Sequence, residues 1–314
     1  MTQKTIQKAY LAAVLNALIV GLSFLFVKVA LAISDPLDTL AHRFTLSFLA
    51  ASIPVLLGWV RLRTTLRDIV SFLPVALFYP VIFFALQAFG LVYTSSSEAG
   101  IIQATVPIFT MILAAYFLKE YTNGMQKVFT LLSVAGVVYI FASKGVDPQS
   151  ANLTGTVLVF LSALSLSAYG VMARKVVKKH HYMDVTYAMT VFGFLFFNGM
   201  SVVSHISAGT LAAFFQPLAN PSFLVSVLYL GVLSSLVTSF LSNYALSHIE
   251  ASKMSVCNQI STLVTIIAGV IWLNERVEIF HVVGGALILI GVVGANVFSS
   301  GRKSALSGDK ALDQ

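Results

Sequence analysis

The fold of this chain is decided by a repeat: residues 86–120 read LQAFGLVYTSSSEAGIIQATVPIFTMILAAYFLKE, and residues 241–275 read LSNYALSHIEASKMSVCNQISTLVTIIAGVIWLNE. The two stretches align without a gap at an offset of 155 positions, with Gln103 on the chemically similar Asn258. The alignment continues without a gap as far as Ser143 of the first stretch. Each stretch therefore belongs to a longer unit that the chain contains twice.

A second block near the start of each half supports the repeat. Residues 15–29 align with residues 161–175 at an offset of 146, and Lys28 falls on Arg174. The second half therefore carries a small insertion between its first and fourth helices. An apolar chain with two equivalent halves is typical of secondary transporters, because two repeats can move about a site held between them.

The composition indicates a membrane protein. Of the 314 residues, 58% are hydrophobic and 10% are charged, and the mean hydropathy is +0.90. A soluble domain carries about 25% charged residues, so much of this surface must face lipid. The single cysteine, Cys257, excludes an intramolecular disulfide, and the sequence contains no common metal, nucleotide or nucleophile motif. We therefore expect no cofactor, no metal and no catalytic residue.

The apolar stretches are long enough to cross a membrane ten times. A span needs about 20 mostly apolar residues, and charged or turn-forming residues separate ten such stretches. The predicted spans are 8–33, 36–58, 69–93, 97–118, 125–143, 153–173, 182–204, 222–247, 252–273 and 278–299. We expect an all-α membrane protein with five helices in each half.

The distribution of Lys and Arg predicts the orientation. Of the 19 cations, Lys144 and Arg276 fall outside and Lys28 and Arg43 fall within spans, while all others lie in cytoplasmic segments if the N-terminus is inside. The net charge of +7 thus reflects topology and not a nucleic-acid partner. We expect a plasma-membrane protein with both termini in the cytoplasm. Because five helices is an odd number, the second half must be inverted relative to the first.

The repeats define the expected domains. The first repeat covers residues 8–143 with helices 1–5, and the second covers residues 153–299 with helices 6–10. Residues 300–314 form a polar cytoplasmic tail that we expect to be disordered. In the longest external loop, the apolar segment at residues 211–215 is expected to form a short helix at the membrane surface.

Motifs in both halves resemble one transporter family. In the first half these are Gly21, Ser23, Phe24, Lys28, Pro36, Arg43, Phe44, Leu86, Thr94–Ala99, Pro107, Leu118–Glu120 and Gly136. In the second half they are Ala245, Leu246, Ala251, Ser252, Leu273–Glu275, Gly284 and Gly291. Together they resemble the ten-helix EamA-type transporters of the drug/metabolite transporter superfamily over about residues 10–298. The resemblance implies a carrier of small organic metabolites, including amino acids, in a family with many exporters. The second half departs by having Thr262 in place of Pro107 and no counterpart of Arg43.

Polar side chains within the spans mark the expected substrate site, because burying them in lipid costs free energy. They recur at helical spacing in helices 1, 3, 4, 6, 8 and 9, which places the site between these helices. Ser and Thr are explained as well by close helix packing, whereas large amides such as Gln103 favour a cavity. The candidate substrate-binding residues are Asn16, Ser23, Tyr79, Gln87, Gln103, Pro107, Tyr169, Asn243, Asn258 and Gln259.

Pro107 is expected to bend helix 4. It lies near the middle of the span and cannot donate to the carbonyl of Gln103, which frees an acceptor there. Pro107 has two functional interpretations: the free carbonyl lines the site, or the bend is a hinge. In the structural interpretation the kink has no role in transport, and a neighbouring helix donates a hydrogen bond to the carbonyl.

Three further candidates, Lys28, His42 and Arg43, lie towards the expected outer ends of helices 1 and 2. Asp38 and His42 stand four residues apart and can face each other on helix 2. The three side chains either anchor the helices at the interface, or they gate the outer mouth or meet an anionic group of the substrate.

The acidic residues at span ends have two interpretations. Glu120 and Glu275 occupy equivalent positions at opposite membrane faces, so we interpret them as structural caps of the repeat. A coupling proton would instead need a titratable group, and histidine titrates near neutral pH. The candidate proton carriers are His42, Glu98, His248 and Glu250, but the favoured interpretation of each is a solvated residue at the membrane interface.

The sequence thus predicts a secondary transporter that moves a small neutral or zwitterionic metabolite by alternating access, and the resemblance implies an amino acid or related compound, with export as the expected direction. It would act in the lipid bilayer as a monomer or homodimer, without hydrolysing ATP. The few charges near the site disfavour a multiply phosphorylated ligand. One alternative is a membrane-embedded enzyme that modifies a lipid or metabolite, but no mid-span cluster of His, Asp, Glu or Cys supports it. A channel or receptor is the other alternative.

Overall fold

The computed structural model describes residues 3–119, 123–144, 152–275 and 278–298. Within these ranges the chain forms helices and no β-strand. Eight helical stretches are long and apolar enough to cross a membrane: Gln3–Leu31, Pro36–Leu56, Asp68–Tyr93, Ser96–Leu118, Leu153–Val176, Tyr182–Ala208, Pro221–His248 and Ala251–Leu273. The predicted all-helical, multi-pass architecture is therefore confirmed.

Each predicted span falls on one or more helices. The first half contains α1 (Gln3–Leu31), α2 (Pro36–Leu56), α3 (Leu66–Ala76), the π-helix η1 (Leu77–Ile82), α4 (Phe83–Tyr93), α5 (Ser96–Gln103), α6 (Val106–Leu118) and α7 (Gly124–Lys144). The second half contains α8 (Asn152–Val176), α9 (Tyr182–Ala208), the 3-10 helix η2 (Leu211–Ala219), α10 (Pro221–Leu228), the π-helix η3 (Tyr229–Val237), α11 (Thr238–His248), α12 (Ala251–Cys257), α13 (Gln259–Leu273) and α14 (Ile279–Val297). Helices α7 and α14 occupy the two remaining predicted spans, so a total of ten membrane crossings stays a prediction. Helix η2 covers the apolar segment in which a short helix was expected.

Two spans are broken near their middle, in both halves of the chain. Helix α5 ends at Gln103 and α6 begins at Val106, whereas α12 ends at Cys257 and α13 begins at Gln259. Given the offset of 155 positions, the two breaks lie within two residues of each other in the repeat. Interrupted helices at corresponding positions of two halves are a strong structural pointer to a transporter's binding site.

The two broken spans also end with the same backbone conformation. Lys119 follows α6 with a left-handed backbone (φ 54°), and Asn274 follows α13 with φ 53°. These residues are 155 positions apart. A positive φ is uncommon for residues other than glycine, so its presence at equivalent positions shows that the local backbone is repeated as well as the sequence.

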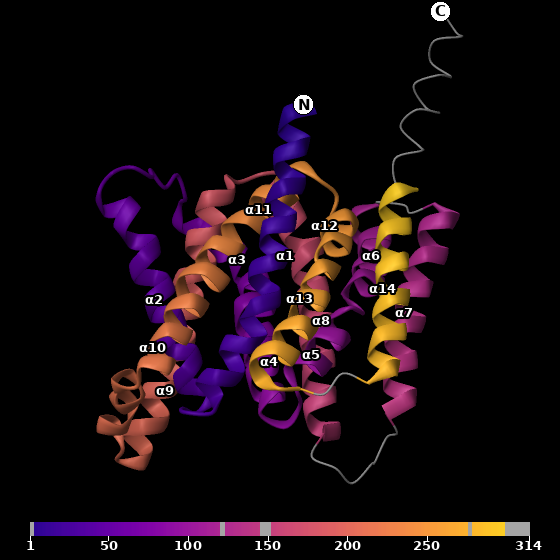
Figure 1. The fold of residues 1–314 in the computed structure, drawn as a ribbon. Helices are drawn as coiled ribbons and strands as arrows, with labels where there is room; N and C mark the ends of the chain where they lie inside the picture. The colour runs from indigo at the N-terminus through magenta and orange to yellow at the C-terminus, as the bar shows by residue number, and fades with distance from the viewer. Residues whose placement is uncertain (1–2, 120–122, 145–151, 276–277, 299–314) are drawn as a thin grey trace, which may run out of the picture.

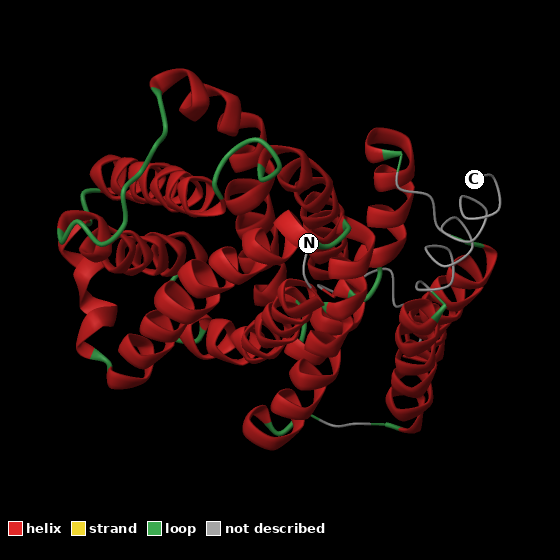
Figure 2. Cartoon of the chain, turned by 90° about the horizontal axis from the view of Figure 1, so that it is seen from above, coloured by secondary structure: helices red, strands yellow, loops and turns green. Residues whose placement is uncertain are grey.

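The broken spans lie where the two halves of the chain contact each other. Helix α1 begins at one end of the bundle and α8 begins at the opposite end, while α14 ends where α1 begins (Figure 1). Helix α1 packs against α11 and α13 of the second half, and α8 packs against α4 and α6 of the first. Seen from above, the start of α1 lies over the middle of the bundle (Figure 2). Helices α7 and α14 pack against each other at one edge (Figure 1).

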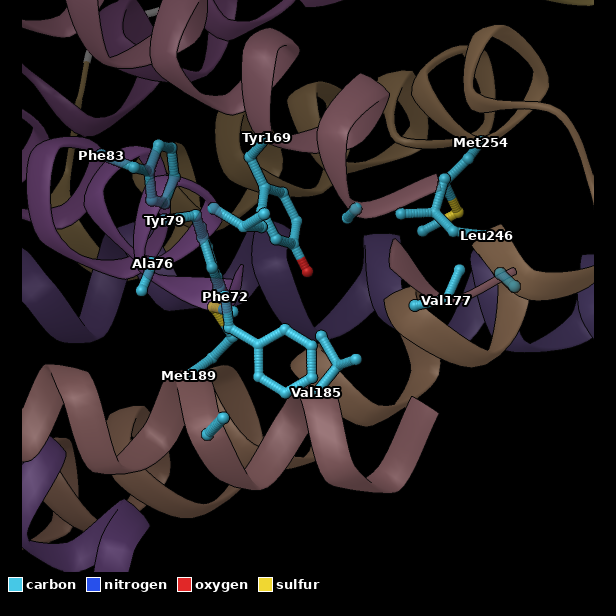
Figure 3. Packing of buried hydrophobic residues seen from close by; sticks show 14 of the residues in the cluster. Phe72, Ala76, Tyr79, Phe83, Tyr169, Val177, Val185, Met189, Leu246 and Met254 are labelled. Carbon is cyan, nitrogen blue, oxygen red and sulfur yellow. The ribbon is translucent and has the colours of Figure 1, made fainter. Parts of the chain in front are cut away.

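The largest cluster of buried apolar residues joins helices of both halves. Phe72 of α3, Tyr169 of α8, Met189 of α9 and Leu246 of α11 belong to it, together with Tyr79 of η1 (Figure 3). This packing fixes the positions of the two tyrosines, which are also candidate site residues.

Candidate functional site

A cavity lies between the halves, beside both helix breaks. The six spans that were predicted to surround the site supply all of its lining residues. Eight of the ten candidate residues line it: Asn16, Ser23, Tyr79, Gln87, Gln103, Tyr169, Asn258 and Gln259. Its volume is about 60 Å³, which holds a few water molecules. No charged side chain lines the cavity within the described ranges of the chain.

The cavity is built from equivalent positions of the two halves. The pairs Val20–Leu166 and Ser23–Tyr169 are 146 positions apart, and both members of each pair line the cavity. Five further lining pairs are 155 positions apart: Tyr79–Ser234, Phe83–Thr238, Gln87–Ser242, Gln103–Asn258 and Val106–Ser261. The repeat therefore sets where the cavity lies, whereas the residue types differ within most pairs.

Two hydrogen bonds join the first helix of each half to the broken span of the other. Asn16 of α1 donates from Nδ2 to Asn258 Oδ1 at 3.0 Å. Gln103 donates from Nε2 to Ser162 Oγ of α8 at 2.8 Å. Asn16 and Ser162 are 146 positions apart, so the two bonds are themselves repeated. They hold the amides in place at the breaks.

Two amide oxygens at the breaks lack a hydrogen-bond donor. Ser162 donates its own proton to the carbonyl of Val159 at 2.7 Å, so Gln103 must approach it with Nε2, and Gln103 Oε1 is buried without a partner. Gln259 donates from Nε2 to the carbonyl of Ala104 at 2.6 Å, and its Oε1 is also buried without a partner. A buried acceptor left without a donor costs about 1–3 kcal/mol. A ligand or water that donates a hydrogen bond would recover this free energy.

Pro107 lies outside the central cavity. It stands in the first turn of α6, directly after the break, where the missing N–H of proline has no cost. Two smaller cavities on another side of the helix contain Pro107 in their lining. The regular α-helix is interrupted at Ala104 and Thr105, which keep right-handed helical angles. The carbonyl bonded there is that of Ala104 and not the one expected at Gln103.

Asn243 also lies outside the cavity but positions a residue that lines it. Its Oδ1 accepts a hydrogen bond from the Tyr169 hydroxyl at 2.9 Å, and its Nδ2 donates to Thr186 Oγ1 at 3.0 Å. The Tyr169 ring stacks on the Tyr79 ring with centroids 4.5 Å apart, and both rings lie in the buried cluster of Figure 3. Asn243 thus fixes one side of the aromatic lining.

The sequence pattern predicts that Asn243 binds the substrate, but in the structure its neighbour Ser242 lines the cavity instead. Ser234, Thr238 and Ser242 line the cavity at intervals of four residues, so the α-helical spacing holds through this span. The neighbour Asn243 lies on a different face, where it bonds Tyr169 and Thr186.

Arg43 is buried directly behind the cavity wall. Its guanidinium donates from Nε to Ser235 Oγ at 2.7 Å and from Nη2 to Ser234 Oγ at 3.0 Å, and it lies 4.0 Å from the centroid of the Phe84 ring. Ser234 and Phe84 both line the cavity. Arg43 is 1% exposed, and no carboxylate of the described part of the chain contacts it. The interfacial-anchor interpretation is therefore wrong for Arg43.

Lys28 binds the end of a helix and does not reach the cavity. Its Nζ donates to the carbonyls of Leu91 at 2.9 Å and Thr94 at 3.0 Å, at the C-terminal end of α4. Arg174, its repeat equivalent, donates from Nη1 to the carbonyl of Leu246 near the end of α11. Because the C-terminal end of a helix carries partial negative charge, each cation stabilises the helix end that it contacts.

His42 and Asp38 do not pair with each other. Asp38 accepts from Ser201 Oγ at 2.6 Å and lies 2.9 Å from His205 Nε2, both on α9. His42 Nε2 lies 2.8 Å from the carbonyl of Phe214 in η2, and its ring stacks on that of Phe214. These contacts tie α2 to α9 and η2, away from the cavity.

Glu275 caps a helix of the other half. Its carboxylate accepts from the backbone N–H groups of Ser96 at 2.9 Å and Ser97 at 3.0 Å, and from both hydroxyls. These are the first residues of α5, where a negative charge stabilises the helix. This agrees with the interpretation of Glu275 as a structural cap, whereas its counterpart Glu120 lies outside the described residues.

Comparison of the sequence with known proteins identifies related transporters. The sequence model of the EamA-like transporter family matches residues 7–142 and 153–297. An uncharacterized transporter of Bacillus subtilis (strain 168), YcxC, is 55% identical over 289 residues, which cover 92% of this chain and 93% of that protein. An uncharacterized transporter of Archaeoglobus fulgidus is 27% identical over 293 residues, covering 91% and 96% of the two chains.

A solved crystal structure shares the fold. It superposes with a TM-score of 0.70 at 18% sequence identity and covers 93% of this chain and 98% of its own. The match thus extends over nearly the whole of both chains. This chain is therefore a multi-pass membrane protein that belongs to the EamA-like transporter family of the drug/metabolite transporter superfamily.

Proposed function

We propose that the protein is a secondary transporter that exports a small, neutral or zwitterionic organic metabolite, such as an amino acid. The central cavity carries this proposal, because it lies between the halves, beside two helix breaks at corresponding positions. Amides, hydroxyls and aromatic rings line it, which suits the orientation of a small polar molecule with an apolar part. Relatives named as transporters support a carrier over a membrane-embedded enzyme.

The proposed mechanism is alternating access, and the arrangement of the two halves supports it. The opposite starting ends of α1 and α8, and the cavity lining drawn in pairs from both halves, support an inverted repeat with ten spans. If the halves exchange conformations, a cavity between them opens first to one side of the membrane and then to the other. The small volume of the cavity suits a conformation in which it is largely closed.

The proposal also includes the membrane in which the protein lies and the direction in which it transports its substrate. The excess of Lys and Arg in the predicted cytoplasmic segments supports a plasma-membrane protein with both termini inside. Export is supported by the resemblance to a family with many exporters. A coupling proton carried by His42, Glu98, His248 or Glu250, and a monomeric or homodimeric assembly, are further parts of the proposal.

A counterflow assay tests the proposal. The purified protein is reconstituted into liposomes loaded with one unlabelled solute, and uptake of the same labelled solute is followed, using amino acids, purines, vitamins and sugars in turn. A carrier produces a transient accumulation of label for one class of solute. A channel gives uptake without accumulation, and an enzyme gives a covalent product. Either of these results, or the absence of counterflow for every solute, would contradict the proposed function.

A further inference from the structure

We propose that the protein binds the headgroups of anionic phospholipids on a surface formed by the α2–α3 and α8–α9 connections, at the end of the bundle where α1 begins (Figure 1). We call it the basic surface, and its exposed cations are Arg61, Arg63, Lys178 and Lys179. None of these residues lines the central cavity. The inference therefore goes beyond the proposed function and holds for any substrate.

Contacts between the two connections hold them side by side. The backbone N–H of Arg63 donates to Oδ1 of Asp184, near the start of α9, at 3.3 Å. His180 Nδ1 lies 3.8 Å from Oδ1 of Asp68, near the start of α3, and the His180 ring meets the Phe72 ring edge-on with centroids 5.0 Å apart. Cations from distant parts of the sequence therefore share one surface.

The basic surface carries an excess of positive charge. Residues 56–68 and 174–184 contain seven Lys and Arg but only two acids. Both acids take part in local contacts, since Asp68 caps α3 together with Thr65, and Asp184 is buried and accepts from the backbone of the α2–α3 connection. The four exposed cations form no ion pair with the described part of the chain. An anion from outside the chain can therefore neutralise them.

The exposed face of α2 indicates where the membrane surface lies. Leu49, Ile53 and Leu57 recur at four-residue intervals and are exposed, as expected for side chains that face lipid. Trp59, which is 77% exposed, follows the helix, and tryptophan is enriched at the level of the lipid headgroups. The next exposed side chain is that of Arg61. Apolar, interfacial and cationic side chains thus follow one another in the order hydrocarbon, interface and phosphate.

The α2–α3 connection presents its arginines on one side. Exposed and half-buried residues alternate without exception from Trp59 to Thr65. This alternation is typical of an extended segment that lies on a surface, because successive side chains point in opposite directions. Arg61 and Arg63 therefore share the exposed side with Trp59. A guanidinium can donate two parallel hydrogen bonds to a phosphate, which suits it to a phospholipid headgroup.

The equivalent connection of the second half has a different character. Residues 209–220, between α9 and α10, contain no charged residue. They include η2, in which Leu211 and Phe215 are exposed, and they lie at the opposite end of the bundle (Figure 1). The positive charge is therefore a property of one face of the protein and not of the repeat. The predicted orientation places this face in the cytoplasm, where the membrane leaflet carries anionic lipids.

A lipid titration tests the basic surface. The purified full-length protein in an uncharged detergent is titrated with phosphatidylglycerol, or with phosphatidylcholine that carries the same acyl chains, while its melting temperature is measured. Because a bound lipid stabilises the folded state by mass action, we expect a saturable rise with phosphatidylglycerol and a much smaller one with phosphatidylcholine. High salt should reduce the rise, since it screens contacts between exposed charges. Glycerol phosphate, which has the headgroup charge without acyl chains, should give no rise.

A double variant assigns the effect to the basic surface. Arg61→Gln with Arg63→Gln should lower the apparent affinity for phosphatidylglycerol about tenfold or more, because each cation near an anionic lipid surface contributes to binding. Neither side chain bonds another residue of the described chain, so the variant should fold. Lys4→Gln with Lys8→Gln removes the same charge from the exposed start of α1 and is the matched control, which should keep the wild-type affinity.

Four results would overturn the inference. Equal rises with the two lipids would show that the protein responds to any bilayer lipid. An unchanged affinity in the arginine variant, or an equal loss in the lysine variant, would show that this surface is not the binding site. A rise with glycerol phosphate as large as that with the lipid would make a free phosphate compound the partner. The wild-type titrations do not depend on whether a variant folds, and none of these results bears on counterflow, which tests the proposed function separately.

Discussion

The two halves place different side chains at the same positions of the cavity. Tyr79, Phe83 and Gln87 form the first-half wall, and their equivalents Ser234, Thr238 and Ser242 form the second-half wall. The backbone is repeated closely enough that all three pairs face the cavity, but one wall is large and mostly aromatic while the other is small and hydroxylated. The repeat therefore determines where a ligand binds, and the difference between the walls determines how it is oriented.

The largest effect on transport is expected when a residue of the second-half wall is replaced by its equivalent from the first-half wall. Thr238→Phe gives the second-half wall the residue that the first has at Phe83, and the added ring takes up space in the cavity that a substrate would need. Larger side chains in packed sites typically cost about 1–3 kcal/mol, so the protein should fold while counterflow is lost. Leu233→Phe, at a partly exposed position of η3, is the control and should transport normally. Normal counterflow by Thr238→Phe would mean that the substrate does not pass this cavity.

The second effect concerns Arg43, which has no counterpart in the second half. Arg43→Ala removes the hydrogen bonds to Ser234 and Ser235, and so the support behind the second-half wall. Hydrogen bonds to a charged group are worth about 1.5–3 kcal/mol, so we expect counterflow of an amino acid to fall about tenfold or more. Arg43→Lys keeps the positive charge but lacks the planar guanidinium, so its counterflow should lie between that of the wild-type protein and that of Arg43→Ala. Undiminished transport by correctly folded Arg43→Ala would reduce this residue to a packing role.

A third prediction compares the equivalent amides of the two breaks. Gln103 has an unpartnered oxygen, whereas the oxygen of Asn258 accepts from Asn16. Gln103→Ala should therefore weaken amino-acid binding by about tenfold, and Asn258→Ala should act less strongly on binding. Titration of the melting temperature with ligand measures both. Equal losses in the two variants would show that the cross-half hydrogen bonds, and not the free oxygen, matter for binding.

Much of this molecule could be predicted from its sequence because lipid imposes a simple rule. Polar side chains in apolar spans must face one another or a cavity, so residues such as Asn16 and Gln87 could be assigned to the lining without a structure. The same rule did not separate Asn243 from its polar neighbour Ser242, because the hydrogen bonds of Asn243 to Tyr169 and Thr186 form only in the folded bundle. The partners of Arg43 could not be predicted either, because they come from residues about 190 positions away.

The break between α12 and α13 is the clearest feature that the sequence did not reveal. Pro107 marked the corresponding position in the first half, but Thr262 stands at its equivalent in the second. Thr262 donates its hydroxyl to the carbonyl of Gly100 on α5 at 2.9 Å. The second break is thus accompanied by contacts between the broken spans, which arise only in the folded bundle and cannot be read from local spacing.

The smallest effect follows from that comparison. Because one half breaks without proline, Pro107→Ala should leave the first break in place, held by the bond from Gln259 to the Ala104 carbonyl. The residue lies at the start of α6, where alanine also fits, so we expect stability to change by less than about 1 kcal/mol and counterflow to stay within about twofold. Thermal unfolding and counterflow of the variant check both expectations. If Pro107→Ala instead abolishes transport in a folded protein, the proline itself maintains the first break, and the two halves reach the same shape by different means.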